Sequence, residues 1–512
     1  MARIKDLREY LKVLESLGDV EHVDRVVNPR LEAAAIARRS TEQRRRVPLF
    51  NNVEGVKPGF RIAGALGALS SDNRNPLARV SLSLGLPHDT TSRELVEHYV
   101  AAHQKPLIPP KLISRDSAPC KQNVLLGERA TLDHFPIPLV HPDDGARYVN
   151  TWGIIVARTP DGRWTNWSIS RIMMIDGRHM TGLFLPQQHI GMIWQEWVKI
   201  GKPMPFAVVQ GGDPGASMIG GMPVPAEMDE GSFLGAFYGE PVDVVKCETV
   251  DLEVPAGAEV VIEGHVSITR GATEGPYAEF HGYAFEETSP EPVYTIEAIT
   301  YRDNPIWPVS ATGRPPDDSQ VGPAVGVSAE LLTLLRNAGL PITTAWLLIE
   351  TACSWAIVTV PPNWRDLLPR TEPSEFVHRI GETMSASRVG RMCPVTFVLD
   401  DDIDPANLSD VLWALGTRIH PNLRQEHWPV TILPWYPCYT AEERHSARGS
   451  IVVHDGLLPA GAREHARPAT FDSLYPPELR ARVLEAEANS DSMSSPKLRV
   501  ASSAQSIKEL VK

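Results

Sequence analysis

Cysteine is scarce in this sequence of 512 residues, and no two cysteines stand close together. The five cysteines are odd in number and form no CxxC pair; they are Cys120, Cys247, Cys353, Cys393 and Cys438. Such a pattern excludes a disulfide framework and a cysteine-based zinc site. We therefore expect free thiols in a reducing, cytoplasmic compartment.

Long apolar runs are also missing. The most apolar stretch, 345–360, is interrupted by Glu350 and Ser354 and falls short of the ~20 residues that span a bilayer. Charged residues occur within the first ten positions, where a secretory signal needs an apolar core, so we expect no signal peptide. The sequence thus predicts no association with a membrane.

An excess of positive charge is absent as well. Lys and Arg number 50 against 63 Asp and Glu, which gives a formal net charge of −13. Because binding to a phosphate backbone needs a basic surface, nucleic acid is a poor candidate partner. Common nucleotide, serine-hydrolase and zinc-protease motifs are lacking too, since no GxGxxG, P-loop, GxSxG or HExxH is found.

What is present is the composition of a globular protein, with 42% hydrophobic and 22% charged residues. Apolar spacing and capping residues predict helices at 4–17, after Asn28, at Thr91 with Glu94 completing a capping box, and at 189–200, 230–238, 328–338, 373–386 and 405–417. Runs rich in β-formers between turn signals predict strands at 151–158, 163–175, 179–184, 206–210, 258–268, 292–302, 345–360 and 394–400.

These elements predict an α+β multidomain fold. We expect an amino-terminal α/β unit over 1–115, a central split β-barrel over 116–305, a carboxy-terminal α/β domain over 306–488 and a loose polar tail over 489–512.

Three segments carry candidate chemistry. In the first, Asn166 to Arg171, a regular strand would place Asn166, Ser168 and Ser170 on one face and Arg171 on the other. A ligand that contacts both faces must lie at a strand end or a bulge. On its own the segment is interpreted as an ordinary exposed strand.

The second segment joins His189, at a helix start, to Gly221-Met222-Pro223 and Glu230 at another helix start. Free N–H groups at a helix start favour an anion such as phosphate, although a histidine there also serves as a simple cap. Together Asn166, His189 and Glu230 make a mostly hard ligand set that suits Mn²⁺ or Mg²⁺.

The third segment is a Gly/Pro loop with two acids five residues apart, Glu274 and Glu279. Paired carboxylates in a pocket acquire different proton affinities when a cation holds one of them ionised, and Arg171 is the candidate cation. A solvated acidic loop is the alternative. The runs Arg44 to Arg46 and Asp400 to Asp402 are interpreted as solvated surface.

Taken together, in this order along the chain, these motifs resemble the UbiD family of decarboxylases, which use prenylated FMN. The resemblance spans the chain to about Glu487 and is strongest to decarboxylases of ferulic acid, pyrrole-2-carboxylate and phenazine-1-carboxylate. It implies a split barrel that binds the flavin, a carboxy-terminal oligomerisation domain, a homodimer or larger assembly, and a flavin prenyltransferase that supplies the cofactor.

The resemblance also assigns roles. Arg171, Glu274 and Glu279 would form the catalytic network, and Asn166, His189 and Glu230 would hold manganese (or Mg²⁺), with K⁺ bound nearby. The cofactor would contact Asn166, Ser168, Ile169, Ser170, Arg171, Gln188, His189, Met222, Glu230 and Arg388, the last standing where relatives place a lysine. The substrate pocket would be lined by Leu185, Gln188, Phe280, Ser319 and Ile432.

The substrate would be an aromatic, heteroaromatic or α,β-unsaturated carboxylic acid. Pyrrole-specific relatives place an asparagine near Ser319, so a polycyclic acid such as phenazine-1-carboxylate is favoured. Two other classes stay open, an FMN-dependent oxidoreductase on a split barrel and a non-catalytic flavin-binding assembly protein.

Overall fold

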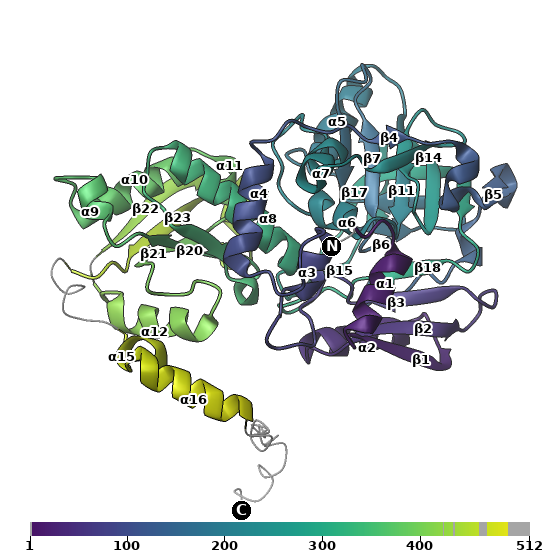
Figure 1. The fold of residues 1–512 in the computed structure, drawn as a ribbon. Coiled ribbons are helices and arrows are strands. Elements are labelled where there is room, and N and C mark those ends of the chain that lie inside the picture. The colour runs from purple at the N-terminus through teal and green to yellow at the C-terminus, as the bar shows by residue number, and fades with distance from the viewer. Residues whose placement is uncertain (1–2, 423, 434–435, 460–467, 490–512) are drawn as a thin grey trace, which may run out of the picture. The chain divides into compact units, whose positions relative to one another are not determined.

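The computed structural model describes residues 3–422, 424–433, 436–459 and 468–489 (Figure 1). Its contacts divide the chain into two units, 1–457 and 458–512. The second unit contains α15 (Phe471–Leu474) and α16 (Pro477–Asn489). Beyond Asn489, the predicted polar tail lies outside the described residues.

The amino-terminal part of the first unit is a four-stranded sheet with helices around it. The strand order is β1-β2-β3-β18, and β18, which follows residue 305, pairs in parallel with β3. The strands are β1 (Val20–Val27), β2 (Val47–Val53), β3 (Arg61–Gly64) and β18 (Ile306–Val309), and the helices are α1 (Leu7–Ser16), α2 (Glu32–Glu42), α3 (Ala78–Ser83) and α4 (Ser92–Ala102).

Helix caps explain where these helices begin. The predicted capping box of Thr91 and Glu94 at α4 is confirmed. The prediction that Asn28 caps the second helix is wrong, because α2 begins at Glu32 after Leu31, whose φ is 73°. The side-chain oxygen of Asn28 instead accepts from the N–H of Arg30 at 2.7 Å, in a turn ahead of the helix.

The central part is a nine-stranded sheet of order β6-β9-β10-β17-β14-β11-β7-β8, with β5 added beside β17. Its strands are β5 (Asn123–Leu126), β6 (Tyr148–Asn150), β7 (Ile154–Arg158), β8 (Thr165–Ser168), β9 (Ile172–Met174), β10 (His179–Gly182), β11 (Met204–Gln210), β14 (Val260–Glu274) and β17 (Ser289–Tyr301). Helices α5 (His189–Lys199), α6 (Pro214–Gly220) and α7 (Glu230–Tyr238) lie between strands. The start of α7 is as predicted, with the Asp229 carboxylate accepting from the N–H of Ser232 at 2.7 Å.

The prediction of one strand over 163–175 is wrong, and the difference shapes the site. Strand β8 ends at Ser168, β9 begins at Ile172, and the two lie six strand positions apart in the sheet. A flat sheet would separate them by about 29 Å, whereas the link 169–171 spans at most about 14 Å. The sheet therefore curls into a half-barrel, and this link bridges its gap.

Two small sheets complete the central part. One has the order β13-β12-β4, and the other is the hairpin of β15 and β16. Their strands are β4 (Lys111–Leu112), β12 (Asp243–Lys246), β13 (Glu253–Pro255), β15 (Tyr277–Ala278) and β16 (Ala284–Phe285). The hairpin turn carries Glu279, whose N–H donates to the carbonyl of Tyr283 at 3.0 Å.

The carboxy-terminal part is a five-stranded sheet of order β19-β20-β21-β23-β22. The strands are β19 (Thr344–Leu347), β20 (Trp355–Val360), β21 (Val395–Asp400), β22 (Gln425–Thr431) and β23 (Arg448–Asp455), and the helices are α8 (Asp318–Asn337), α9 (Trp364–Leu367), α10 (Pro373–Ser385), α11 (Arg388–Arg391), α12 (Leu408–Arg418) and α13 (Ala441–Ser446).

Two predictions here need correction. The single strand over 345–360 is wrong, because β19 and β20 are antiparallel partners joined through Ala352 and Cys353, whose φ values of 54° and 59° reverse the chain. Helix α8 starts at Asp318 rather than near 328, because Asp317 and Gln320 form a capping box. The poor helix formers in 322–326 obscured that start.

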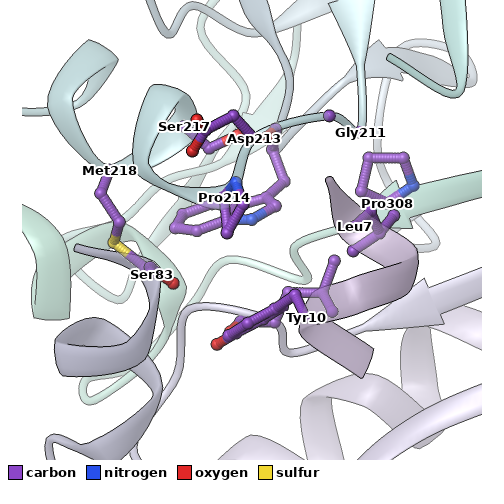
Figure 2. Close-up of a pocket in the computed structure, with 12 residues that line it drawn as sticks. Leu7, Tyr10, Ser83, Gly211, Asp213, Pro214, Ser217, Met218 and Pro308 are labelled. Carbon is purple, nitrogen blue, oxygen red and sulfur yellow. Dashed lines mark hydrogen bonds between the residues drawn. The ribbon is translucent and has the colours of Figure 1, made fainter. Parts of the chain in front are cut away.

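A small void separates α1 from α6 (Figure 2). Leu7, Tyr10 and Met218 line it, and its volume of about 10 Å³ is too small for a substrate. The Tyr10 hydroxyl donates to the carbonyl of Leu66 at 2.9 Å, which fixes α1 against the segment that follows β3. The void is therefore a packing feature.

Within the described ranges, none of the helices has the length and apolar character needed to cross a bilayer. The five cysteines are free thiols.

Candidate active site

The gap of the half-barrel opens into a cavity of about 560 Å³. Ligand pockets for small molecules usually measure about 300–1,000 Å³. Fourteen of the residues predicted from the sequence line it: Asn166, Ser168, Ile169, Ser170, Arg171, Leu185, Gln188, His189, Met222, Glu230, Glu279, Phe280, Ser319 and Arg388. Segments far apart in the sequence thus meet at one cavity.

Arg171 contacts both acids of the Gly/Pro loop. Its Nε and Nη2 donate to the two carboxylate oxygens of Glu274 at 2.9 and 2.7 Å, and its Nη1 pairs with Glu279. Glu274 is fully buried and lies behind Arg171, whereas the Glu279 side chain is 27% exposed and reaches the cavity. Residues 169–171 lie outside β8, so the alternation of side chains along a strand does not apply to Arg171. Arg171 therefore lines the same cavity as Asn166.

Two tyrosines support this network from behind. The hydroxyl of Tyr148 donates to Glu274 Oε1 at 2.9 Å, and the ring of Tyr277 lies 5.3 Å below the Arg171 guanidinium. Burial lowers the pKa of Arg171, but the hydrogen bonds and charge of Glu274 outweigh it and raise that pKa above its ordinary value. Arg171 is therefore a fixed cation, with an acidic side chain on either side.

A second polar cluster gathers around Glu230, which is 2% exposed. Glu230 Oε1 accepts from Asn166 Nδ2 at 2.6 Å and lies 3.3 Å from His189 Nδ1. The other oxygen accepts from the N–H of Trp167 at 2.8 Å. Burial raises the pKa of Glu230, and the hydrogen bond from His189 opposes that rise.

Two oxygen atoms on β8 lack a hydrogen-bond partner among the described residues. Asn166 Oδ1 and Ser168 Oγ are buried and accept or donate no hydrogen bond among the described residues. Buried polar atoms are normally paired, so both atoms indicate a ligand. A carboxylate, an amide oxygen and an imidazole also fit a hard divalent cation. A cluster of three or more His, Cys, Asp or Glu that could hold a metal does not occur in the described ranges, and the candidate set here has two such residues beside the Asn166 amide.

Three further residues predicted from the sequence, Arg388, Met222 and Ile432, lie in different surroundings. Arg388 Nη1 lies 3.5 Å from His189 Nε2, on the side of the Glu230 cluster. Met222 is buried at the end of α6. Ile432 is 2% exposed and packs near Gly449, and it is not among the residues that line the cavity.

Sequence reasoning missed several lining residues. His281, Asp318 and Arg444 face the cavity, and Tyr436 closes part of it by donating its hydroxyl to the carbonyl of Ala352 at 3.2 Å. His281 lies two residues after Glu279, so its place in the motif was a usable signal. The others lie on elements whose approach no local pattern reveals.

The comparisons with known proteins agree with this arrangement. Residues 11–99, 111–315 and 324–446 match the N-terminal, Rift-related and C-terminal domains of 3-octaprenyl-4-hydroxybenzoate carboxy-lyase, UbiD. The chain is 37% identical to pyrrole-2-carboxylic acid decarboxylase of Pseudomonas aeruginosa, over 94% of this chain and 97% of that relative. It is also 37% identical to ferulic acid decarboxylase 1 of Saccharomyces cerevisiae, over 86% and 88%.

Among solved structures, the chain resembles an evolved dimeric form of the UbiD-class enzyme HmfF from Pelotomaculum thermopropionicum, solved in complex with prFMN. The TM-score is 0.75 at 24% identity, over 92% of this chain and 98% of that one, which is a likeness of fold. Given the two relatives and the three domain matches, this chain belongs to the UbiD family of decarboxylases, which are carboxy-lyases.

Proposed function

We propose that this chain catalyses the reversible, non-oxidative decarboxylation of an aromatic, heteroaromatic or α,β-unsaturated carboxylic acid with prenylated FMN. The observation that carries the proposal is the contact of Arg171 with both Glu274 and Glu279 at the wall of the cavity. An oxidoreductase has no need for a cation held between two acids at this place.

The chemistry explains why such a group is needed. Loss of CO₂ from an sp² carbon would leave an unstabilised carbanion, and no side chain can accept its electron pair. When bound, the prenylated flavin supplies the electron sink. The protein then has to orient the acid, exclude water and deliver one proton to the carbon that carried the carboxylate.

The residues divide these tasks. Arg171, held by Glu274, orients the carboxylate of the substrate. Glu279, on the hairpin turn and partly exposed to the cavity, donates the proton. A well-placed acid of this kind contributes roughly 10²–10⁴-fold to the rate.

The Glu230 cluster would hold a divalent cation, and the charge of that cation would attract the cofactor phosphate. Asn166, His189 and Glu230 would bind Mn²⁺ or Mg²⁺, with K⁺ nearby, and the free N–H groups at the start of α5 favour the same anion. Arg388 would add positive charge, and Ser168, Ile169, Ser170, Gln188 and Met222 would contact the flavin. Loading would depend on a flavin prenyltransferase.

The substrate proposal rests on the lining of the cavity. Leu185, Phe280 and Tyr436 give it apolar surface suited to a flat ring. A polycyclic acid such as phenazine-1-carboxylate stays a prediction, as does assembly as a homodimer.

A direct test combines the mass of the bound cofactor with a screen for CO₂ release over aromatic and acrylic acids. The protein is co-expressed with a flavin prenyltransferase. We expect the mass of prenylated FMN and CO₂ from at least one acid. Ordinary FMN that NAD(P)H reduces, with no CO₂ released, would overturn the proposal in favour of an oxidoreductase.

A further inference from the structure

One wall of the cavity is formed by His281, Phe285, Glu287 and Arg444, here called the Arg444 wall. Arg444 lies on α13, while the other three lie on or beside the β15–β16 hairpin. In the part of the chain that the structure describes, Arg444 takes no part in the ion pairs of Arg171. The cavity therefore has a further cation besides Arg171 and Arg388, and this cation is separate from the catalytic network.

The charge of Arg444 is poorly balanced. Its Nη1 lies 3.9 Å from Glu287 Oε1, at the limit of an ion pair, and the Glu287 side chain is 74% exposed against 23% for Arg444. Such a pair with one partner in water contributes little. Moreover, Arg444 Nε is buried and finds no hydrogen-bond acceptor among the described residues. A guanidinium N–H without an acceptor indicates that an acceptor belongs there.

His281 presents a second unpaired nitrogen to this wall. The residue is 9% exposed, and its Nδ1 is buried with no partner within the described ranges. Burial, followed by the positive charges of Arg444 and Arg171, lowers the pKa of His281 to about 4. At neutral pH the imidazole is therefore uncharged and offers one N–H donor. The uncharged imidazole does not balance the positive charge of Arg444.

We propose that Arg444 and His281 form a subsite for a second carboxylate of the substrate, so that the preferred substrates are aromatic or acrylic dicarboxylic acids. One carboxylate is oriented by Arg171 and leaves as CO₂, and the other is bound by Arg444 and His281. A carboxylate suits the wall better than a neutral group because it supplies both the missing acceptor and the missing charge. This inference rests on the proposed function for the fate of the first carboxylate.

The test compares two matched pairs of probes, cinnamate with 4-carboxycinnamate and 2-naphthoate with naphthalene-2,6-dicarboxylate. Binding is measured by calorimetry on the full-length protein carrying Glu279→Gln to prevent turnover, with and without cofactor. We expect at least one dicarboxylate to bind about tenfold or more tightly than its partner, the effect of one charge-assisted hydrogen bond.

Variants then assign the preference to residues. Arg444→Met, which keeps volume but removes charge, should bring the ratio of the two dissociation constants close to one, and His281→Phe should lower it by several-fold. Arg448→Met is the matched control, because Arg448 is an exposed arginine four residues away that does not line the cavity. It should leave the ratio unchanged.

Two results would overturn the subsite. One is equal binding of mono- and dicarboxylates in both pairs, and the other is an Arg444→Met variant that weakens both members of a pair by the same factor. Failure of the proposed function looks different. It would appear as no CO₂ release from any acid by the loaded enzyme with Glu279 intact, while the Arg444-dependent preference persisted.

Discussion

At the scale of single residues, Arg171 determines what the two acids can do. Its two hydrogen bonds to the buried Glu274 fix the guanidinium plane, and this leaves Nη1 toward Glu279 at the cavity. A lysine could not make this bidentate contact and hold a second acid in the same plane. The geometry thus separates the buried Glu274 from Glu279, which reaches the cavity and which we propose as the proton donor.

Replacing Glu279 by Gln removes the proposed proton donor and keeps nearly the same shape. We expect kcat for CO₂ release to fall by about 10²–10⁴-fold, with flavin content unchanged. Steady-state CO₂ release and the flavin absorbance of the purified protein check this. Full turnover by the variant would remove Glu279 from the mechanism.

Tyr148 should act as a positioning residue. Tyr148→Phe removes one of the donors to Glu274 but leaves both hydrogen bonds from Arg171. We expect kcat/KM to fall by about tenfold, the usual effect of one lost hydrogen bond to a charged group. Tyr283→Phe, at a side chain 59% exposed, is the control. Equal rates for both variants would show that Glu274 needs no support from Tyr148.

The sequence could predict the residues that form motifs but not those that support them. Asn166, His189, Glu230 and the two acids stand in recognisable local patterns. Tyr148 lies on β6, four strand positions away from β14 in the sheet, yet its hydroxyl reaches Glu274 at the end of β14. Ile432 shows the reverse case, because the resemblance assigns it to the substrate pocket whereas it is not among the residues that line the cavity.

At the scale of elements, the start of α8 places Asp318 and Ser319 at the cavity. Burial, and then the charge of Asp317, raises the pKa of Asp318 to about 6. The folded protein therefore binds the proton of the Asp318 carboxyl group more tightly than the unfolded chain does. The resulting stability is present below the ordinary pKa near 4 and is lost as pH rises through about 6.

Asp318→Asn should abolish this dependence, because the amide stays neutral. We expect the melting temperature of the variant, relative to wild type, to rise between pH 4.5 and 7.5 by about 2 °C. Thermal melts across that range measure the difference. A constant difference would mean that Asp318 ionises in the folded protein as it does in the unfolded one.

Helices whose first residues carry local capping signals could be predicted from the sequence. The exceptions depend on tertiary packing. The capping box at Thr91 and the cap at Asp229 mark their helices locally. The break between β8 and β9 has no local signal, because it arises from the closure of the whole sheet. The late start predicted for α8 reflects Gly and Pro residues that tertiary packing tolerates.

At the scale of the whole molecule, the half-barrel brings the Glu230 cluster and the Arg171 network to one cavity. The Glu230→Ala variant should lower the content of both flavin and divalent metal, since the carboxylate would bind the cation that attracts the cofactor phosphate. Metal analysis by mass spectrometry and flavin absorbance measure both. Normal content of flavin and metal in this variant would refute the proposed metal site at Glu230.

The overall class of fold was predictable because the three parts differ in their patterns, with helices first, strands in the middle and alternation at the end. The contacts between these parts could not be predicted from the sequence. The strand β18 returns to the amino-terminal sheet, and α13 brings Arg444 to a cavity made mostly by the central part. Such long-range approaches depend on packing, which one sequence does not display.

The most direct test of the account is a decarboxylation run in D₂O by the cofactor-loaded enzyme, with the product analysed by NMR. We expect one deuterium at the carbon that carried the carboxylate, and formation of that product about 10²–10⁴-fold more slowly by Glu279→Gln. A product that carries no deuterium at that carbon, or the same labelled product formed at the same rate by Glu279→Gln, would contradict it.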